Sequence, residues 1–135
     1  MREKPLILLV DDDPDFLEIV SLKLRSSGFD AEVAHNAVES LRRTEELQPD
    51  LILMDIHMPG STGTDAALAV KQNPKTKDIH IAFLSSLNDP WPAMKGEKDR
   101  ISGELGMDAF LSKTDDLNDL VRQIREILAK IKGAA

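Results

Sequence analysis

Carboxylates, hydroxyls and one ammonium group stand directly after the short apolar runs of this chain. A carboxylate beside a bound cation can act as a nucleophile toward a phosphoryl group, and a lysine and a hydroxyl can hold the phosphoryl oxygens. Oxygen ligands without His or Cys favour a hard cation, and Mg²⁺ is the natural choice. The set therefore indicates Mg²⁺-dependent phosphoryl transfer. In chain order it comprises Asp11, Asp12 and Asp13 after Leu6–Val10, Asp55 after Leu51–Met54, Ser85 and Ser86 after Ile79–Leu84, and Ser112 and Lys113 after Asp108–Leu111.

Each member of this set has an ordinary structural interpretation when it is taken alone. The three consecutive aspartates can be an acidic cluster at a helix N-terminus, and Asp13 before Pro14 is best interpreted as a helix cap. Asp55 can be a turn residue, and serines at strand ends and surface lysines are common. The prediction of a shared site therefore depends on all the groups occurring in this order after successive apolar runs.

The apolar runs alternate with helical patterns, which predicts five β-α units around a parallel sheet. Runs that are apolar on both faces suit strands covered by helices on two sides, whereas the weaker runs Ala31–Ala34 and Asp108–Leu111 suit positions nearer a sheet edge. Such sheets carry their functional groups at the carboxyl ends of the strands. We expect helices after the caps Asp13, Asn36 and Asp116, one over about Thr64–Gln72, and one between Ala93 and Leu105.

The bulk composition narrows the class of protein. A length of 135 residues, with 41% hydrophobic and 30% charged residues, predicts one soluble domain over residues 1–135. The absence of Cys excludes disulfides and thiolate metal sites. No apolar stretch is long enough for a membrane span or a signal peptide, so we expect a cytoplasmic protein. A formal net charge of −7 disfavours direct binding to nucleic acid.

Three segments of the chain resemble the receiver domains of bacterial response regulators, of which the chemotaxis regulators are an example. The resemblance covers nearly the whole chain. It implies an α/β fold with a doubly wound, five-stranded parallel sheet of order 2-1-3-4-5, the flavodoxin-like (βα)5 arrangement. It also implies a switch domain that assists its own phosphorylation and dephosphorylation, not a turnover enzyme. The segments are Leu6–Pro14, Pro49–Gly60 with the following Gly63, and Gly106–Lys113.

The same resemblance implies a role for each matching acidic residue. Asp55 corresponds to the aspartate that accepts the phosphoryl group and also binds the metal ion. Asp11 and Asp12 correspond to the acidic pair that holds Mg²⁺. The backbone carbonyl of His57 corresponds to the remaining protein ligand. The implied phosphodonor is a histidine kinase or a phosphotransfer protein.

Three further residues correspond to those that, in the family, respond to the phosphoryl group once it is bound. The resemblance implies that the Ser85 hydroxyl moves onto the phosphoryl group and that Lys113 pairs with that group. It implies that Phe110 turns inward when the hydroxyl moves. The face formed by the fourth helix, the fifth strand and the fifth helix would then change shape and bind a so far unknown output protein.

The chain departs from the family pattern at two places near the site. Thr114 stands where the family usually has proline after the lysine, so we predict a trans Lys113–Thr114 bond, because a cis bond before a non-proline residue costs about 2.5–4 kcal/mol. The segment after Ser85 is longer than usual and contains Pro90-Trp91-Pro92. Trp91 either covers the side of the sheet or anchors a partner.

Two other functions remain open from the sequence. A receiver-like module that binds a partner independently of phosphorylation is suggested by Thr114 and by the longer segment. A Mg²⁺-dependent phosphatase with its nucleophile after the first strand is suggested by Asp11-x-Asp13, but Asp15-Phe16 does not fit that family. Phosphate-ester turnover that requires Asp11 and not Asp55 would identify the phosphatase.

Overall fold

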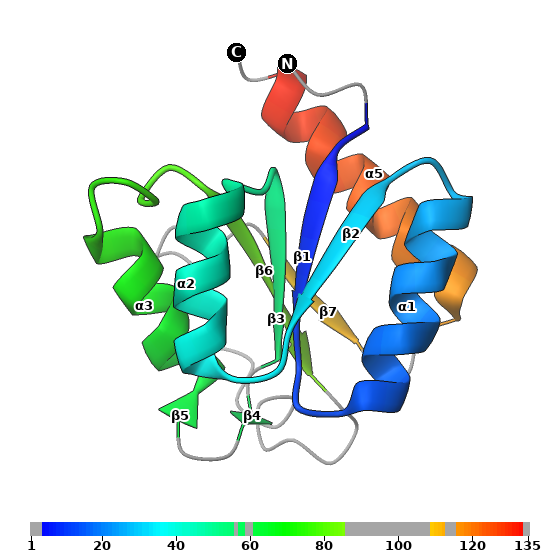
Figure 1. Ribbon diagram of the computed structural model, residues 1–135. Coiled ribbons are helices and arrows are strands. Elements are labelled where there is room, and N and C mark those ends of the chain that lie inside the picture. The colour runs from blue at the N-terminus through cyan, green and yellow to red at the C-terminus, as the bar shows by residue number, and fades with distance from the viewer. Residues whose placement is uncertain (1–3, 56, 59–60, 86–108, 113–115, 134–135) are drawn as a thin grey trace.

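The computed structural model describes residues 4–55, 57–58, 61–85, 109–112 and 116–133, and Figure 1 shows its elements. Within these ranges, one parallel sheet has the strand order β2-β1-β3-β6-β7. The order of its first four members agrees with the predicted 2-1-3-4, and β7 pairs beside β6. The strands are β1 (Leu6–Val10), β2 (Asp30–Ala34), β3 (Leu51–Asp55), β6 (His80–Ser85) and β7 (Ala109–Ser112).

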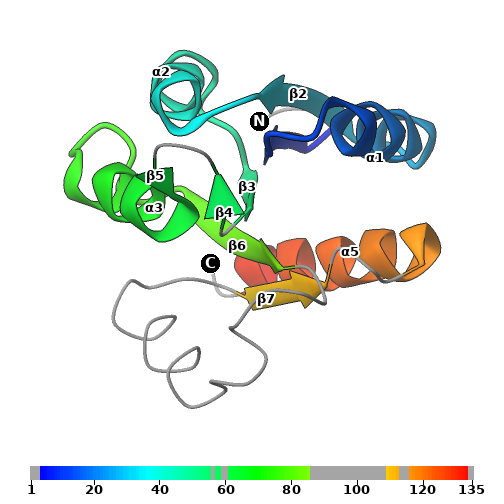
Figure 2. The ribbon, with the colours of Figure 1, turned by 90° about the horizontal axis from the view of Figure 1, so that it is seen from below.

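Helices cover both faces of this sheet. Figure 2 shows α1 and α5 on one face and α2 and α3 on the other. The helix predicted between Ala93 and Leu105 lies outside the described residues. The bounds of the helices are α1 (Pro14–Ser26), α2 (Ala37–Leu47), α3 (Gly63–Gln72) and α5 (Leu117–Gly133).

The central strands are buried on both faces, as their continuous apolar sequences predict. All five residues of β1 and all five of β3 are buried. Successive side chains of a strand point to opposite faces, so alternate residues enter two different cores. Leu9 and Leu53 pack in the core under α1 and α5, whereas Val10 and Met54 pack in the core under α2 and α3. The sheet is therefore held from both sides up to the ends of its central strands.

The helix starts agree with the caps predicted from the sequence. The Asp13 side chain accepts hydrogen bonds from two backbone N–H groups in the first turn of α1. Asn36 accepts one from the first turn of α2 at 2.8 Å, and Asp116 accepts one from the N–H of Asn118 at 2.8 Å. After α1, Gly28 has a φ of 97°, a conformation that glycine adopts without strain.

Several predicted element bounds were wrong by one residue. Asp55 is the last residue of β3, although the sequence placed it just after the strand. Strand β6 begins at His80 and includes Ser85, and β7 begins at Ala109 and includes Ser112. The apolar pattern marks the buried part of a strand, whereas backbone pairing continues into the polar residue that follows. The backbones of Asp55, Ser85 and Ser112 are thus part of the sheet.

One helix end is strained in a way that can be tested. Gln48 follows α2 in the left-handed conformation, with φ 49° and ψ 60°, and its N–H bonds to the Thr44 carbonyl at 3.0 Å. Left-handed backbone costs a residue with a Cβ about 1–2 kcal/mol, and glycine avoids this cost. We expect Gln48→Gly to raise the free energy of unfolding by about 1 kcal/mol in urea titrations. Glu46→Gly, inside the helix, is the control and should lower it by about the same amount. A loss of stability at both positions would contradict the prediction.

Candidate functional site

Asp11 and Asp55 lie side by side at the carboxyl ends of the two strands in the middle of the sheet. Strands β1 and β3 are parallel, and Val10 pairs with Met54, so the next residue of each strand reaches the same level. The register is fixed at the other end by Asp50. Its carboxylate accepts a hydrogen bond from the Leu6 N–H at 2.7 Å, and its own N–H donates to the Leu6 carbonyl at 2.9 Å.

Asp11 is held by its neighbours on two sides. Its N–H donates to the Ala34 carbonyl at 3.2 Å, which continues the pairing of β1 with β2 by one residue. Its Oδ1 accepts a hydrogen bond from the N–H of Asp13 at 3.0 Å. The residue is completely buried. Its carboxylate is therefore fixed in place before any ligand binds.

The three consecutive aspartates separate into two roles. Asp13 caps α1, with its Oδ1 3.0 Å from the Asp15 nitrogen and 3.4 Å from the Phe16 nitrogen. Asp11 and Asp12 instead face Asp55, and the cluster that contains them does not include Asp13. The sequence interpretation of Asp13 as a helix cap is confirmed.

Asp11, Asp12 and Asp55 form one acidic cluster. One carboxylate oxygen from each lies within 4.8 Å of the other two. Asp12 is exposed, whereas Asp11 and Asp55 are 0% and 5% exposed. Three negative charges at this separation repel one another, more strongly where burial reduces screening by water. A cation with oxygen ligands would relieve the repulsion, and this donor set of carboxylates, without nitrogen or sulfur, fits Mg²⁺.

The structure places the backbone of three other predicted site residues. His57 lies in β4 (His57–Met58), opposite Thr62 of β5 (Ser61–Thr62). Ser85 ends β6 one residue beyond Leu84, the partner of Asp55, so it reaches the same edge of the sheet. Phe110 lies in β7 opposite Phe83. The side chains of His57, Ser85 and Phe110 are not among those described.

Other predictions lie entirely outside the described residues. These are the role of Lys113, the trans bond before Thr114, and the role of Trp91 in the longer segment after β6. They remain predictions.

The sequence analysis missed the small antiparallel pair of β4 and β5. It follows β3 directly and precedes α3, so it lies at the carboxyl edge of the sheet, as Figure 1 shows. The signal available in the sequence was Met58-Pro59-Gly60, because proline and glycine are frequent where the chain turns back. Two residues on each side are too few for a period-2 pattern.

A doubly wound α/β domain with an acidic cluster at the carboxyl edge of its central strands has the arrangement that the resemblance to receiver domains implies. Residues 7–125 match the response regulator receiver domain family, and the chain belongs to that family. Response regulators are the signalling components of two-component systems.

The chain is similar to curated regulators over almost its full length. It is 34% identical over 131 residues to the transcriptional regulatory protein PrrA of Mycobacterium leprae, a match that covers 96% of this chain and 52% of that protein. It is 29% identical over 127 residues to the DNA-binding dual master transcriptional regulator RpaA of Synechocystis, covering 93% and 50%. The chain therefore spans about half the length of the curated relatives it matches.

Solved receiver structures share the fold. A CheY-like response regulator receiver domain protein from Methanospirillum hungatei aligns with a TM-score of 0.83 and 25% identity, covering 98% of this chain and 99% of that one. The chemotaxis response regulator CheY4 of Vibrio cholerae aligns with a TM-score of 0.79 and 25% identity, covering 92% and 98%. In the part of the chain that the structure describes, we find no helix with the length and apolar character that a membrane span requires.

Proposed function

We propose that this chain is a phosphorylation-controlled signalling switch that accepts a phosphoryl group on Asp55. The observation that carries the proposal is the position of Asp55. It ends a central strand, is 5% exposed, and has carboxylate oxygens of Asp11 and Asp12 within 4.8 Å. A carboxylate in such a cluster can act as a nucleophile once a cation offsets the surrounding negative charge. Membership of the receiver family supports the same acceptor.

In the proposed reaction, a carboxylate oxygen of Asp55 attacks the phosphorus atom of a phosphohistidine or of an acyl phosphate. The bond from phosphorus to the donor nitrogen or oxygen breaks, and its electron pair stays on the donor. Asp11, Asp12, Asp55 and the backbone carbonyl of His57 would hold Mg²⁺, which when bound supplies positive charge beside the phosphoryl oxygens. Lys113 and the Ser85 hydroxyl are the proposed contacts of the remaining oxygens.

The proposed output is a change in protein binding. Ser85 and Phe110 would change position together, and the affected face would comprise β7, α5 and the fourth helix predicted from the sequence. Formation of that helix would complete the (βα)5 fold, and residues 1–135 would form one domain. The phosphodonor would be a histidine kinase or a phosphotransfer protein, and the domain would assist its own phosphorylation and dephosphorylation without turning over a substrate.

The net charge of the chain favours a protein partner over nucleic acid. A formal net charge of −7 does not favour direct contact with nucleic acid, so the DNA binding named for the longer relatives would belong to other parts of those proteins. We propose that the domain acts in the cytoplasm on a protein partner.

Intact-mass spectrometry tests the acceptor. The chain is incubated with Mg²⁺ and acetyl phosphate, and we expect a gain of one phosphoryl group. Asp55→Asn should show no gain, and neither should the parent chain in excess chelator. Asp13→Asn is the matched control and should be phosphorylated like the parent, because Asp13 caps α1. A chain that gains no phosphoryl group from either acetyl phosphate or a panel of phosphorylated transfer proteins would instead support the phosphorylation-independent binding module.

A further inference from the structure

A pocket of about 310 Å³ lies at the amino end of the sheet, between the turn that joins α1 to β2 and the second half of α5. Pro5 and Phe29, the residues just before β1 and β2, both line it. The acidic cluster lies at the other end of the same sheet. A five-residue strand such as β1 spans about 17 Å, so the pocket is separate from the candidate metal site.

The turn after α1 leaves room for this pocket. Gly28 has a φ of 97°, and a Cβ added there would meet no atom within 4 Å. The next side chain, Phe29, is 5% exposed and packs in the core under α1 and α5. Leu128 belongs to the same core and lines the pocket from α5. The pocket therefore has apolar walls and an open mouth beside the glycine.

Arg125 of α5 supplies a positive charge to the pocket. Its Nη2 donates a hydrogen bond to the Ser27 carbonyl at 2.7 Å, and its guanidinium lies over the Phe29 ring, 5.7 Å from the ring centre. Both contacts are with uncharged groups, so they hold the guanidinium in place without neutralising it. Arg125 forms no ion pair with a carboxylate of the described residues. Its remaining N–H donors form a fixed fork that suits a carboxylate.

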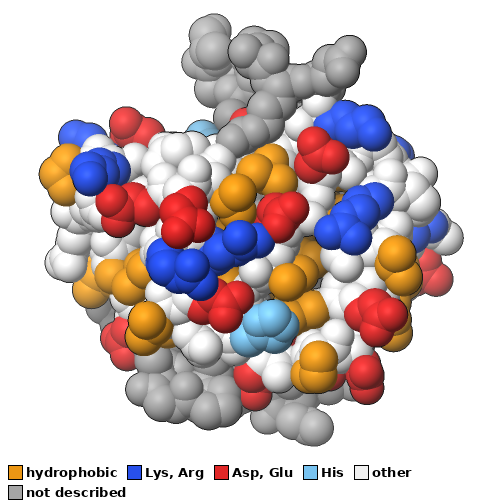
Figure 3. Space-filling model, viewed as in Figure 1, with side chains coloured by type: hydrophobic (Ala, Val, Ile, Leu, Met, Phe, Trp, Pro, Cys, Tyr) orange, Lys and Arg blue, Asp and Glu red, His pale blue; other side chains and the backbone are white. Residues whose placement is uncertain are grey.

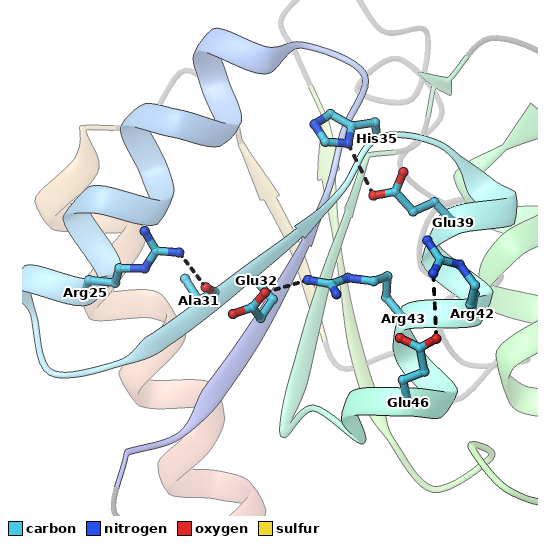
Figure 4. Close-up of polar contacts among 8 residues, drawn as sticks. All are labelled: Arg25, Ala31, Glu32, His35, Glu39, Arg42, Arg43 and Glu46. Carbon is cyan, nitrogen blue, oxygen red and sulfur yellow. Dashed lines mark hydrogen bonds and ion pairs between the residues drawn. The ribbon is translucent and has the colours of Figure 1, made fainter.

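Other arginines of the described surface have acidic partners. Figure 4 shows Arg43 of α2 paired with Glu32 of β2. It also shows Arg42 paired with Glu46, and Figure 3 shows acidic and basic side chains interspersed over the face that carries β2. Arg25 bonds a backbone carbonyl, but it does not line the pocket. The pocket thus combines an unneutralised guanidinium with apolar walls, which the arginines of Figure 4 do not.

We propose that this pocket binds a small organic carboxylate with an apolar body. The carboxylate would accept hydrogen bonds from the remaining N–H groups of Arg125, and the apolar body would lie against Phe29 and Leu128. Ligand pockets combine apolar walls with a few polar groups, and this volume is at the lower end of their usual range of about 300–1,000 Å³. An inorganic anion would leave the apolar walls uncovered, and a neutral molecule would leave the guanidinium without a counter-charge.

Two-dimensional NMR titration of the intact chain with 3-phenylpropionate, in excess chelator, tests the proposal. We expect saturable shifts of the amides of Ser27, Gly28, Phe29 and Ala129, with a Kd of about 1–10 mM for a ligand of this size. The neutral 3-phenylpropionamide has nearly the same shape. It should bind at least tenfold more weakly, because the hydrogen bonds between two charged groups are lost.

Two variants assign the binding to the guanidinium. Arg125→Gln should weaken binding of 3-phenylpropionate at least tenfold. Arg122→Gln is the matched control and should bind like the parent, because Arg122 pairs with Asp119 and Glu126 on the exposed side of the same helix. Ala129→Glu leaves Arg125 in place and adds a competing carboxylate one helical turn away, so it should weaken binding about twofold, whereas Ala129→Gln should not.

Three results would overturn the proposal. The first is equal binding of the acid and the amide, since the charge would then have no role. The second is equal binding of the acid by Arg125→Gln and by the parent. The third is a set of shifts that do not saturate or that centre on another part of the chain, which would mean non-specific contact with the surface.

Discussion

Mg²⁺ at about a hundred times its Kd should raise the free energy of unfolding of this chain by about 3 kcal/mol, and Asp12→Ala should remove most of that increase. A ligand that binds only the folded state stabilises it in proportion to the logarithm of its concentration over Kd. Asp12 supplies one of the three clustered carboxylates and is exposed, so its truncation removes a ligand without opening a cavity. The measurement is urea unfolding of both chains in Mg²⁺ and in chelator.

The matched control for this prediction is Asp13→Asn. Asn is as good a helix cap as Asp, so α1 should keep its start, and Asp13 lies outside the acidic cluster. The control should respond to Mg²⁺ like the parent. If Asp12→Ala gained as much stability from Mg²⁺ as the parent does, the ion would bind elsewhere and the candidate metal site would be wrong.

The separation of Asp11–Asp13 into one helix cap and two cluster carboxylates could be predicted from the sequence, because it depends on residues that are adjacent in the chain. Asp followed by Pro is typical of a helix start, and this assigned Asp13 to α1. Asp11 and Asp12 could then be assigned to the end of the first strand, where parallel sheets carry functional groups. The convergence of both with Asp55 followed from the strand order that the resemblance implied, in which the first and third strands are neighbours, as they are in the structure.

The details that the sequence did not supply depend on contacts between distant segments. Asp50 bonds Leu6 across 44 residues and fixes the register of β1 with β3. Nothing in its sequence context distinguishes it from a turn residue. The contact of Arg25 with the Ala31 carbonyl likewise depends on where α1 lies over β2. A sequence pattern reports which face of an element is apolar, but not which side chain reaches a neighbouring backbone.

In helix α5 too, the sequence pattern did not report every contact with neighbouring elements. Leu120, Val121, Ile124 and Leu128 recur at helical spacing as one apolar stripe, and these side chains are buried. Ile127 lies beside this stripe and is buried as well, at 8% exposure. A helix packed between a sheet and a neighbouring helix buries a wider face than a single stripe, and α1 contacts α5 here. The width of a buried face is decided by the neighbours and not by the helix itself.

Asp55→Asn should raise the free energy of unfolding of the chain in chelator by about 1–4 kcal/mol, the range between bulk water and a protein surface for two charges about 4–5 Å apart. The substitution removes one of three repelling charges from a largely buried position. Asn is nearly the same size, so the packing at the end of β3 should be preserved. Urea unfolding of the parent and the variant in excess chelator measures the difference.

Two comparisons show whether relief of the repulsion within the cluster is the cause of the higher free energy of unfolding. Asp78→Asn, at an exposed position after α3, removes the same charge from the surface and should change stability by less than about 0.5 kcal/mol. Added Mg²⁺ should reduce the advantage of Asp55→Asn, because the ion offsets the repulsion in the parent and binds the variant less well. A variant no more stable than the parent in chelator would mean that the carboxylates are already balanced by other groups. If the advantage is found, the chain retains at Asp55 a carboxylate that weakens the metal-free fold, as expected of a residue kept for its chemistry.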